Sequence, residues 1–589
     1  MSAPFHRRQL ISRTACIALL AISLAASGQA ASPALKQADA AYRAGQAALA
    51  RQDLSAAQAD FEQVVRLAPS AEQGHSALGA VLVSRGLTKQ GIRELEAALA
   101  LKKTDTTAQM NLAIAYQQTG QPAKAIPLFA ALEAGKHTLP AYAIASYSRS
   151  LAATRKFPQA AEQMKAALQA DPKNPELHDQ LGSIYAQQER WLDAQRQFEA
   201  AIQLNPALAI AHLHLGLAMH AQGQPDAAKE LTQAQQLAPD NPAIRIELGK
   251  ALAAAGQDEQ AISLFQQVLQ QQPESTEAKY ELALALQRSN KVQDAIALLR
   301  SVVAAEPRNA DALTNLGMAL TQAQQAKDAV PVLQHSTALA PQSVTAHQDL
   351  AAAYVQLSQV ADAIRELHTA LKLSPDTSQL HYDLGLALKM QDDAADAIPE
   401  LEAAEKLDPT APEAPYVLGV LYMQTGRYEE AAREIKTSLN LRPENGDGWA
   451  TLGSVYSKLN MLPEATSALR EAIKQLPEQP DPHLTLAGVL AKQDQPAEAT
   501  AERKKAADLM RTNMNRQRAE VATNAGKSLL KNGDLEGATV QFRDALSYDA
   551  NYAEAHLGLA MVLDRQGKTL DAAAERQKAD AAAKTVNSQ

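Results

Sequence analysis

The stretch Ala411–Glu444 reads APEAPYVLGVLYMQTGRYEEAAREIKTSLNLRPE and holds two amphipathic patterns separated by a polar turn. In each pattern the apolar residues follow the three- and four-residue spacing of one helix face. They are Leu418, Gly419 and Tyr422 in the first pattern, and Tyr428, Ala431 and Ile435 in the second. Pro443 ends the second pattern. The stretch therefore predicts a helical hairpin in which the small residues Gly419 and Ala431 let the two helices approach closely.

The same columns recur along the chain with a spacing close to 34 residues. The column of Gly419 holds a small residue in all sixteen copies: Gly45, Gly79, Ala113, Ser148, Gly182, Gly216, Gly249, Ala283, Gly317, Ala351, Gly385, Gly419, Gly453, Ala487, Gly526 and Ala560. Twelve residues after each of them comes an alanine, with Gly91 as the exception. A third column holds aromatic residues at Phe61, Phe129, Phe198, Phe265 and Phe542 and mostly leucine elsewhere. This agreement among columns predicts sixteen copies of one hairpin.

The pattern resembles the tetratricopeptide repeat, whose signature of Leu-Gly, Tyr, Ala, an aromatic residue and Pro is matched by Leu418, Gly419, Tyr422, Ala431 and Pro443. Ile435 stands where the family usually has the aromatic residue. The resemblance implies an all-α fold, an α-α superhelix or solenoid of about sixteen helix-turn-helix repeats. Such an array is stabilised by the stacking of neighbouring repeats.

The repeat frame divides the chain into a signal peptide, a short N-terminal segment, repeats 1 to 14, a helical extension, repeats 15 and 16, and a short tail. The corresponding ranges are 1–30, 31–37, 38–513, 514–518, 519–586 and 587–589. The extension follows from the spacing between repeats 14 and 15, which grows from 34 to 39 residues without a proline or glycine between Pro496 and Gly526. We expect one continuous helix there. Its basic residues alternate with acidic ones, so a solvated face is favoured over a nucleic-acid site.

The N-terminus has the features of a bacterial-type secretory signal. Arginines precede the apolar run 15–26, which is shorter than the roughly 20 residues of a spanning helix, and Gly28-Gln29-Ala30 offers small residues for cleavage after Ala30. We expect an exported protein, periplasmic or secreted, without a transmembrane segment in the mature chain. Both the general secretory and the twin-arginine route are compatible with the sequence.

Cleavage would remove Cys16, the only cysteine, so the mature chain would form no disulfide. It would also take the formal net charge from −9 to −12, because the segment carries three arginines and no acidic residue. A nucleic-acid partner is therefore disfavoured.

No catalytic constellation stands out. The chain has no HExxH, P-loop or GxSxG motif and no metal-spaced Cys/His set, and no nucleophile is paired with a base. His212 and His214 are two residues apart on one predicted helix, so they point to different faces, and we expect ordinary surface residues. The sequence thus predicts a protein that is not an enzyme and needs no cofactor or metal.

The resemblance places the ligand in a groove lined by the first helix of each hairpin. The family's dicarboxylate clamp is absent, because its lysine column contains no lysine, and the asparagine ladder known in the family is reduced to Asn111, Asn315 and Asn524. In its place the ladder column offers a row of carboxylates, with tyrosines one position earlier. The candidate partner-binding residues are Glu247, Glu281, Asp349, Asp383, Tyr280, Tyr382, Tyr416 and Asn315. This set suits a protein or peptide segment that is basic and partly apolar, although a solvated lining without a ligand is the alternative.

The sequence therefore predicts an exported, non-catalytic scaffold for protein–protein interaction. One alternative is an envelope assembly factor for pilus or exopolysaccharide machinery. Another is the substrate-recruiting arm of a glycosyltransferase-like complex whose catalytic domain lies on another chain.

Overall fold

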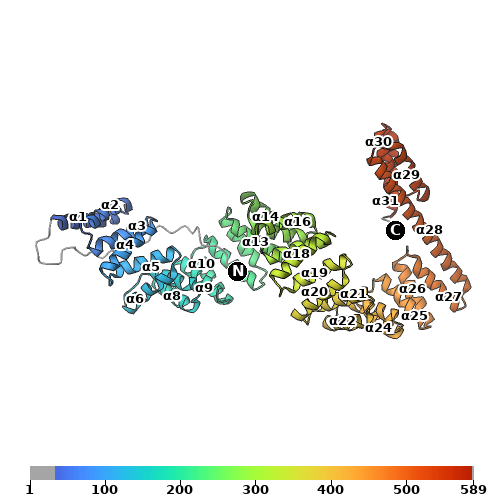
Figure 1. The fold of residues 1–589 in the computed structure, drawn as a ribbon, viewed down its shortest axis with the longest axis horizontal. Coiled ribbons are helices and arrows are strands. Elements are labelled where there is room, and N and C mark those ends of the chain that lie inside the picture. The colour runs from blue at the N-terminus through green and yellow to red at the C-terminus, as the bar shows by residue number, and fades with distance from the viewer. Residues whose placement is uncertain (1–32, 587–589) are drawn as a thin grey trace. The chain divides into compact units, whose positions relative to one another are not determined.

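The computed structural model describes residues 33–586, and within this range the chain is built of helices with no strand. The signal peptide predicted at 1–30 and the tail at 587–589 lie outside the described residues. The chain divides into two units, the first ending at Ala305 and the second beginning at Glu306. Figure 1 shows that each unit is a row of antiparallel helix pairs. The all-α repeat architecture predicted from the sequence is confirmed.

The first unit contains α1 (Pro33–Ala50), α2 (Leu54–Leu67), α3 (Glu72–Ser84), α4 (Thr88–Leu101), α5 (Thr106–Gln118), α6 (Pro122–Ala134), α7 (Ala141–Ala153), α8 (Phe157–Ala170), α9 (Pro175–Ala186), α10 (Trp191–Leu204), α11 (Ala209–Ala221), α12 (Ala227–Leu237), α13 (Pro242–Ala254), α14 (Asp258–Gln271), α15 (Thr276–Arg288) and α16 (Val292–Ala305). The first helix begins at Pro33, before the expected start of the repeats at Ala38.

The second unit contains α17 (Ala310–Gln322), α18 (Ala326–Leu339), α19 (Val344–Gln356), α20 (Val360–Leu373), α21 (Ser378–Met390), α22 (Ala394–Leu407), α23 (Glu413–Gln424), α24 (Tyr428–Leu441), α25 (Gly446–Lys458), α26 (Leu462–Gln475), α27 (Pro480–Lys492), α28 (Pro496–Lys531), α29 (Leu535–Tyr548), α30 (Ala553–Arg565) and α31 (Thr569–Val586). Because α28 serves as the second helix of one hairpin and the first helix of the next, the 31 helices of residues 33–586 make sixteen hairpins.

The helix predicted to join repeats 14 and 15 is present as α28, which runs without a break through 36 residues. Each half buries side chains: Ala506 and Leu509 in the first half, Ala519 and Ala522 in the second. Ala519 and Ala522 pack with Ala545 of α29 and Ala555 of α30. Between the two halves, residues 510–514 and 516–518 are exposed.

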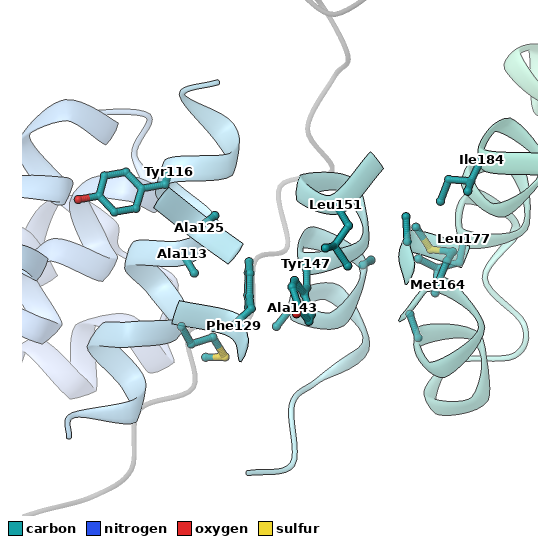
Figure 2. Close-up of a cluster of buried hydrophobic side chains, with 14 of the residues drawn as sticks. Ala113, Tyr116, Ala125, Phe129, Ala143, Tyr147, Leu151, Met164, Leu177 and Ile184 are labelled. Atoms are coloured by element: carbon teal, nitrogen blue, oxygen red, sulfur yellow. The ribbon is translucent and has the colours of Figure 1, made fainter. Parts of the chain in front are cut away.

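The two small columns lie at the helix crossings, as predicted. A Cβ added to Gly385 on α21 would lie 2.6 Å from Cγ of Leu401 and 3.3 Å from the carbonyl oxygen of Ala397, both on α22. Ala397 and Leu401 are fully buried. The aromatic column fills the same layer, since all five of its phenylalanines are at most 1% exposed. Figure 2 shows this layer around Phe129 of α6, whose ring stacks on that of Tyr147 of α7 with centroids 5.2 Å apart.

One position of the alanine column is displaced from the prediction. In the hairpin of α11 and α12 the residue opposite Gly216 is Ala227, whose carbonyl oxygen would lie 3.2 Å from an added Cβ, while Ala228 is only half-buried. The repeat from Gly216 to Gly249 is one residue shorter than 34, and the missing residue falls before Ala227. The helix α12 begins at Ala227. Its N-cap residue, Asp226, makes no side-chain capping bond.

Every hairpin turn of the described chain contains one residue with a left-handed backbone. Seven turns use glycine, which adopts this conformation without strain. The other nine use Gln52, Arg155, Glu189, Asn290, Gln324, Ser358, Asp392, Asn460 and Asp494, with φ between 56° and 61°. The turn geometry is therefore kept where the sequence offers no glycine, and helix packing must offset the cost of these conformations.

Candidate functional site

The first helices of successive hairpins share one face, which we call the first-helix face. Polar side chains on it bond from one repeat to the next. Arg149 of α7 donates to Oε1 of Gln180 on α9 over 3.1 Å. Gln348 of α19 donates to Oδ2 of Asp383 on α21 over 2.8 Å. Equivalent positions of neighbouring repeats therefore lie close together within each unit, and all predicted partner-binding residues lie on these helices.

Glu247 on α13 and Glu281 on α15 share their part of the face with a lysine. Nζ of Lys250 lies 3.3 Å from Oε1 of Glu247 and 2.6 Å from Oε1 of Glu277. Burial by itself lowers the pKa of Lys250. The bond to Glu277 and the charge of Glu247 outweigh this effect, so the pKa is raised and the ammonium form is favoured. Burial also raises the pKa of the Glu281 carboxyl, against the opposing effect of Lys250. This cluster of three carboxylates and one amine is less acidic than the sequence suggests.

Asp349 on α19 is a carboxyl without protein partners for its buried oxygen. Its Oδ2 accepts no hydrogen bond within the described structure. Burial alone raises the pKa of Asp349 to about 7, because no donor or cation compensates for the lost hydration. At neutral pH the protonated form of this side chain is therefore substantially populated. A cationic or hydrogen-bonding group that approached this oxygen would remove an unfavourable feature of the free protein.

Asp383 on α21 is held between two amides. Its Oδ2 accepts from Gln348 and its Oδ1 accepts from Gln379, each over 2.8 Å. Burial raises the pKa of Asp383, and the two bonds only partly offset this effect. The carboxylate is thus fixed in orientation.

The aromatic and amide candidates flank these carboxyls. Tyr382 and Tyr416, on α21 and α23, are half-buried, and burial together with the charges of Glu413 and Asp383 raises the pKa of the Tyr382 phenol. Tyr280 on α15 is also half-buried. Asn315 on α17 donates from Nδ2 to the carbonyl of Asp311 over 2.9 Å, so part of its hydrogen-bonding capacity is used within its own helix.

The structure places Glu247 and Glu281 in the first unit and Asp349 and Asp383 in the second. Within each unit the two carboxyls occupy the same position on first helices of successive repeats. A single row of four stays a prediction. Sequence reasoning missed the groups that modify these carboxyls. Lys250 was detectable as the residue three positions after Glu247, whereas Gln348 pairs with Asp383 across 35 residues and only the stacking reveals it.

The expectation that His212 and His214 are ordinary surface residues is wrong for His212. His212 is buried, with Nδ1 2.8 Å from Oε2 of Glu230 and Nε2 3.1 Å from the carbonyl oxygen of Pro206. His214 is half-buried on the first-helix face, with Nδ1 2.7 Å from Oδ1 of Asp179. The two rings therefore have separate partners.

Two further features of residues 33–586 bear on function. No cluster of three or more His, Cys, Asp or Glu side chains there has the arrangement of a metal site. None of the helices in that range combines the length and apolar character needed to cross a membrane.

Comparison with known families identifies repeats along most of the chain. Profiles described as "Tetratricopeptide repeat" match residues 38–70, 110–175, 225–276, 388–455 and 523–585, and one described as "TPR repeat" matches 182–223. A profile described as "Psidin, N-terminal TPR repeats region" matches 252–382. No curated protein matches the sequence.

Several solved structures are similar in fold. The crystal structure of the APC/C hetero-tetramer Cut9-Hcn1 has 17% identity over 90% of this chain and 96% of that chain, with a TM-score of 0.36. MamA from Desulfovibrio magneticus RS-1 has 23% identity over 29% of this chain and 97% of its own, with a TM-score of 0.28. YrrB, described as a TPR protein with an unusual peptide-binding site, has 18% identity over 32% of this chain and 96% of its own, with a TM-score of 0.28.

Proposed function

The chain belongs to the tetratricopeptide-repeat family, and on that premise we propose that it is a non-catalytic scaffold that binds a segment of another protein along its first-helix face. The observation that carries this proposal is the buried, unpartnered oxygen of Asp349, in the repeat next to the fixed carboxyl of Asp383. A protein gains nothing in stability from such a carboxyl. A partner that donates to it would recover that cost on binding.

The partner chemistry follows from these neighbours. A lysine or arginine side chain placed between Asp349 and Asp383 would be attracted by both carboxyls and would favour their ionised forms. Tyr382 and Tyr416 offer half-buried rings for an apolar side chain or for the stem and head of a cationic one. The proposed ligand is therefore a basic, partly apolar peptide segment.

Binding of such a segment should depend on pH. Burial raises the pKa of Asp349 to about 7, so a large share of the free protein carries a proton on this carboxyl at neutral pH. A bound cation favours the ionised carboxylate and would therefore expel that proton. Affinity should accordingly increase as the pH rises from about 6 to about 8.

We further propose that the protein is exported by means of the signal predicted at 1–30. The support is the sequence alone: the arginines, the short apolar run and the small residues before Ala31. N-terminal sequencing of the protein isolated from its host should begin near Ala31. Full-length chain recovered only from the cytoplasm would overturn this part of the proposal.

Selection from a random peptide library tests the binding proposal and does not require that the partner be identified. The wild-type chain should enrich peptides that contain lysine or arginine together with apolar residues. The test variant replaces the four candidate carboxyls, E247Q/E281Q/D349N/D383N. The matched control removes the same charges from exposed positions on second helices, E259Q/D294N/D396N/E429Q.

The control should select the same peptides as the wild type, and the test variant should lose the enrichment of basic residues. If the test variant selects the same basic peptides, or if wild type and control show no basic preference, the first-helix face does not bind as proposed. Circular dichroism of both variants checks that the fold is retained.

A further inference from the structure

Five histidines form the same three-way contact in five different repeats, and we call them the histidine staples. They are His75, His212, His347, His381 and His556. Each lies on a first helix, four residues before the small residue at the crossing. In each, Nδ1 lies 2.5–2.8 Å from Oε2 of a glutamate on the second helix of the same hairpin. The glutamates are Glu94, Glu230, Glu366, Glu400 and Glu575.

The other ring nitrogen contacts the preceding repeat. In all five, Nε2 lies 2.9–3.2 Å from the backbone carbonyl oxygen of the residue six positions earlier. These carbonyls belong to Pro69, Pro206, Pro341, Pro375 and Ala550, which lie in the turns between one hairpin and the next. One imidazole ring thus joins the two helices of its own hairpin to the turn that leaves the previous hairpin.

The two acceptors determine how many protons the ring needs in order to make both bonds. A carboxylate and a carbonyl are both acceptors, so a ring that bonds to both must donate from both nitrogens, and only the protonated imidazolium does so. A neutral ring donates once and turns a lone pair toward the other acceptor. Among the described residues, the glutamate is the only charged side chain bonded to each ring, and Glu575 additionally accepts from Lys578 over 2.8 Å.

Other repeats show what the column does when it cannot titrate. Trp449 occupies the same position, and its Nε1 donates to the carbonyl of Pro443 over 2.9 Å. Arg245 likewise donates to the carbonyl of Pro239. Both side chains keep their proton at every pH near neutrality. His178, in the same column, keeps the imidazole but faces glutamine in place of glutamate, with Nδ1 2.9 Å from Oε1 of Gln197.

We propose that the histidine staples are proton-dependent couplings between neighbouring repeats. In a solenoid each repeat is held by its contacts with the adjacent repeats. A bond at the junction between two repeats therefore contributes directly to the free energy of their stacking. With the ring protonated, the turn is tied to the next hairpin. When the ring loses its proton as the pH rises, one of the two bonds is lost at each staple and the junction loosens. The junctions of Trp449 and Arg245 keep their donors, so the array would loosen only at chosen places.

Hydrogen exchange of the full chain tests this inference, with rates corrected for the intrinsic effect of pH. Between about pH 5.5 and about pH 8.5, opening of the turns that precede the five staples should increase by about tenfold, the effect of losing one charge-assisted bond. The turn at Pro443, tied by Trp449, is the internal control and should not change. Equal changes at the stapled turns and at Pro443 would overturn the inference.

A variant distinguishes the effect of the histidine–glutamate charge pair from the effect of side-chain packing. The substitutions E94Q/E230Q/E366Q/E400Q/E575Q keep size and an acceptor oxygen, and the native contact of His178 with Gln197 shows that glutamine fits opposite this histidine. Without the carboxylate, the imidazolium loses its charged partner, so the pH dependence of exchange at the stapled turns should shrink. A pH dependence as large as in the wild type would show that the proton is not held at the staples. Should the variant fail to fold, the comparison with the turn at Pro443 in the wild type still decides the question.

Discussion

Replacing Ala397 by leucine tests how closely the two helices of a hairpin approach. Ala397 on α22 is fully buried, and its carbonyl oxygen would lie only 3.3 Å from a Cβ added to Gly385 on α21. Leucine brings three further carbon atoms into this crossing. Leu401 already fills the adjacent space, since its Cγ would lie 2.6 Å from the same added Cβ. The helices must therefore separate or the side chains must leave their preferred rotamers.

Overpacking of this kind costs about 1–3 kcal/mol. The matched control is Ala395→Leu, two residues away on α22, where the side chain is exposed and the change should stay within about 0.5 kcal/mol. Ala431→Leu changes the same column in the next hairpin and should cost as much as Ala397→Leu.

Urea unfolding of the full chain, followed by circular dichroism, gives the comparison. Ala397→Leu and Ala431→Leu should lower the midpoint, or produce an early transition confined to the affected repeats, because a solenoid can unfold locally. If Ala397→Leu and Ala395→Leu unfold at the same concentration of urea, the helix crossing accommodates a leucine without strain. That result would refute the reasoning.

Three further predictions concern charge and helix continuity. Asp349→Asn should stabilise the protein above about pH 7 by about 1–3 kcal/mol and have little effect below about pH 4. The reason is that a carboxyl with a pKa raised by burial to about 7 favours folding when protonated and loses this contribution as the pH rises; unfolding of both proteins across this range measures it. Lys250→Met should cost about 1 kcal/mol by leaving Glu247 and its neighbours unneutralised, and added salt should narrow the difference in unfolding midpoint; a gap independent of salt would argue against the ion cluster. Asn513→Pro should break the exposed middle of α28 at a cost of about 3 kcal/mol. The break should appear as faster hydrogen exchange around this residue. Unchanged exchange would mean that the two halves do not depend on one continuous helix.

The repeat fold could be predicted from the sequence because sixteen copies average out local ambiguity. A buried small residue such as Gly385 recurs in every copy, and a recurring column fixes both the helix and the face that it buries. The long helix α28 was predictable for a related reason, since breakers are absent where the repeat spacing grows. The displacement at Ala227 was not, because two adjacent alanines give the same sequence signal and only packing against Gly216 distinguishes them.

The state of the candidate site depended on information that the repeat pattern does not contain. Counting carboxyls suggested a row of charges, yet the ionisation of Asp349 follows from its burial and from the absence of a donor, and both are properties of the folded stack. His212 likewise contacts Pro206, six positions earlier, and Glu230, eighteen positions later. Helical periodicity does not predict this combination of contacts. The residues that recur in every repeat predict the fold, whereas the state of the candidate site depends on residues that differ between repeats.

Site-specific photo-crosslinking in the host cell tests most directly the claim that a partner binds along the first-helix face. A photoreactive phenylalanine analogue would replace Tyr382 or Tyr416 on this face, and Tyr428, at the start of the second helix α24, would serve as the control. We predict a shared adduct at Tyr382 and Tyr416, lost when D349N/D383N is introduced, and no such adduct at Tyr428. An adduct at Tyr428 alone, or adducts at Tyr382 and Tyr416 that persist in D349N/D383N, would contradict binding along this face.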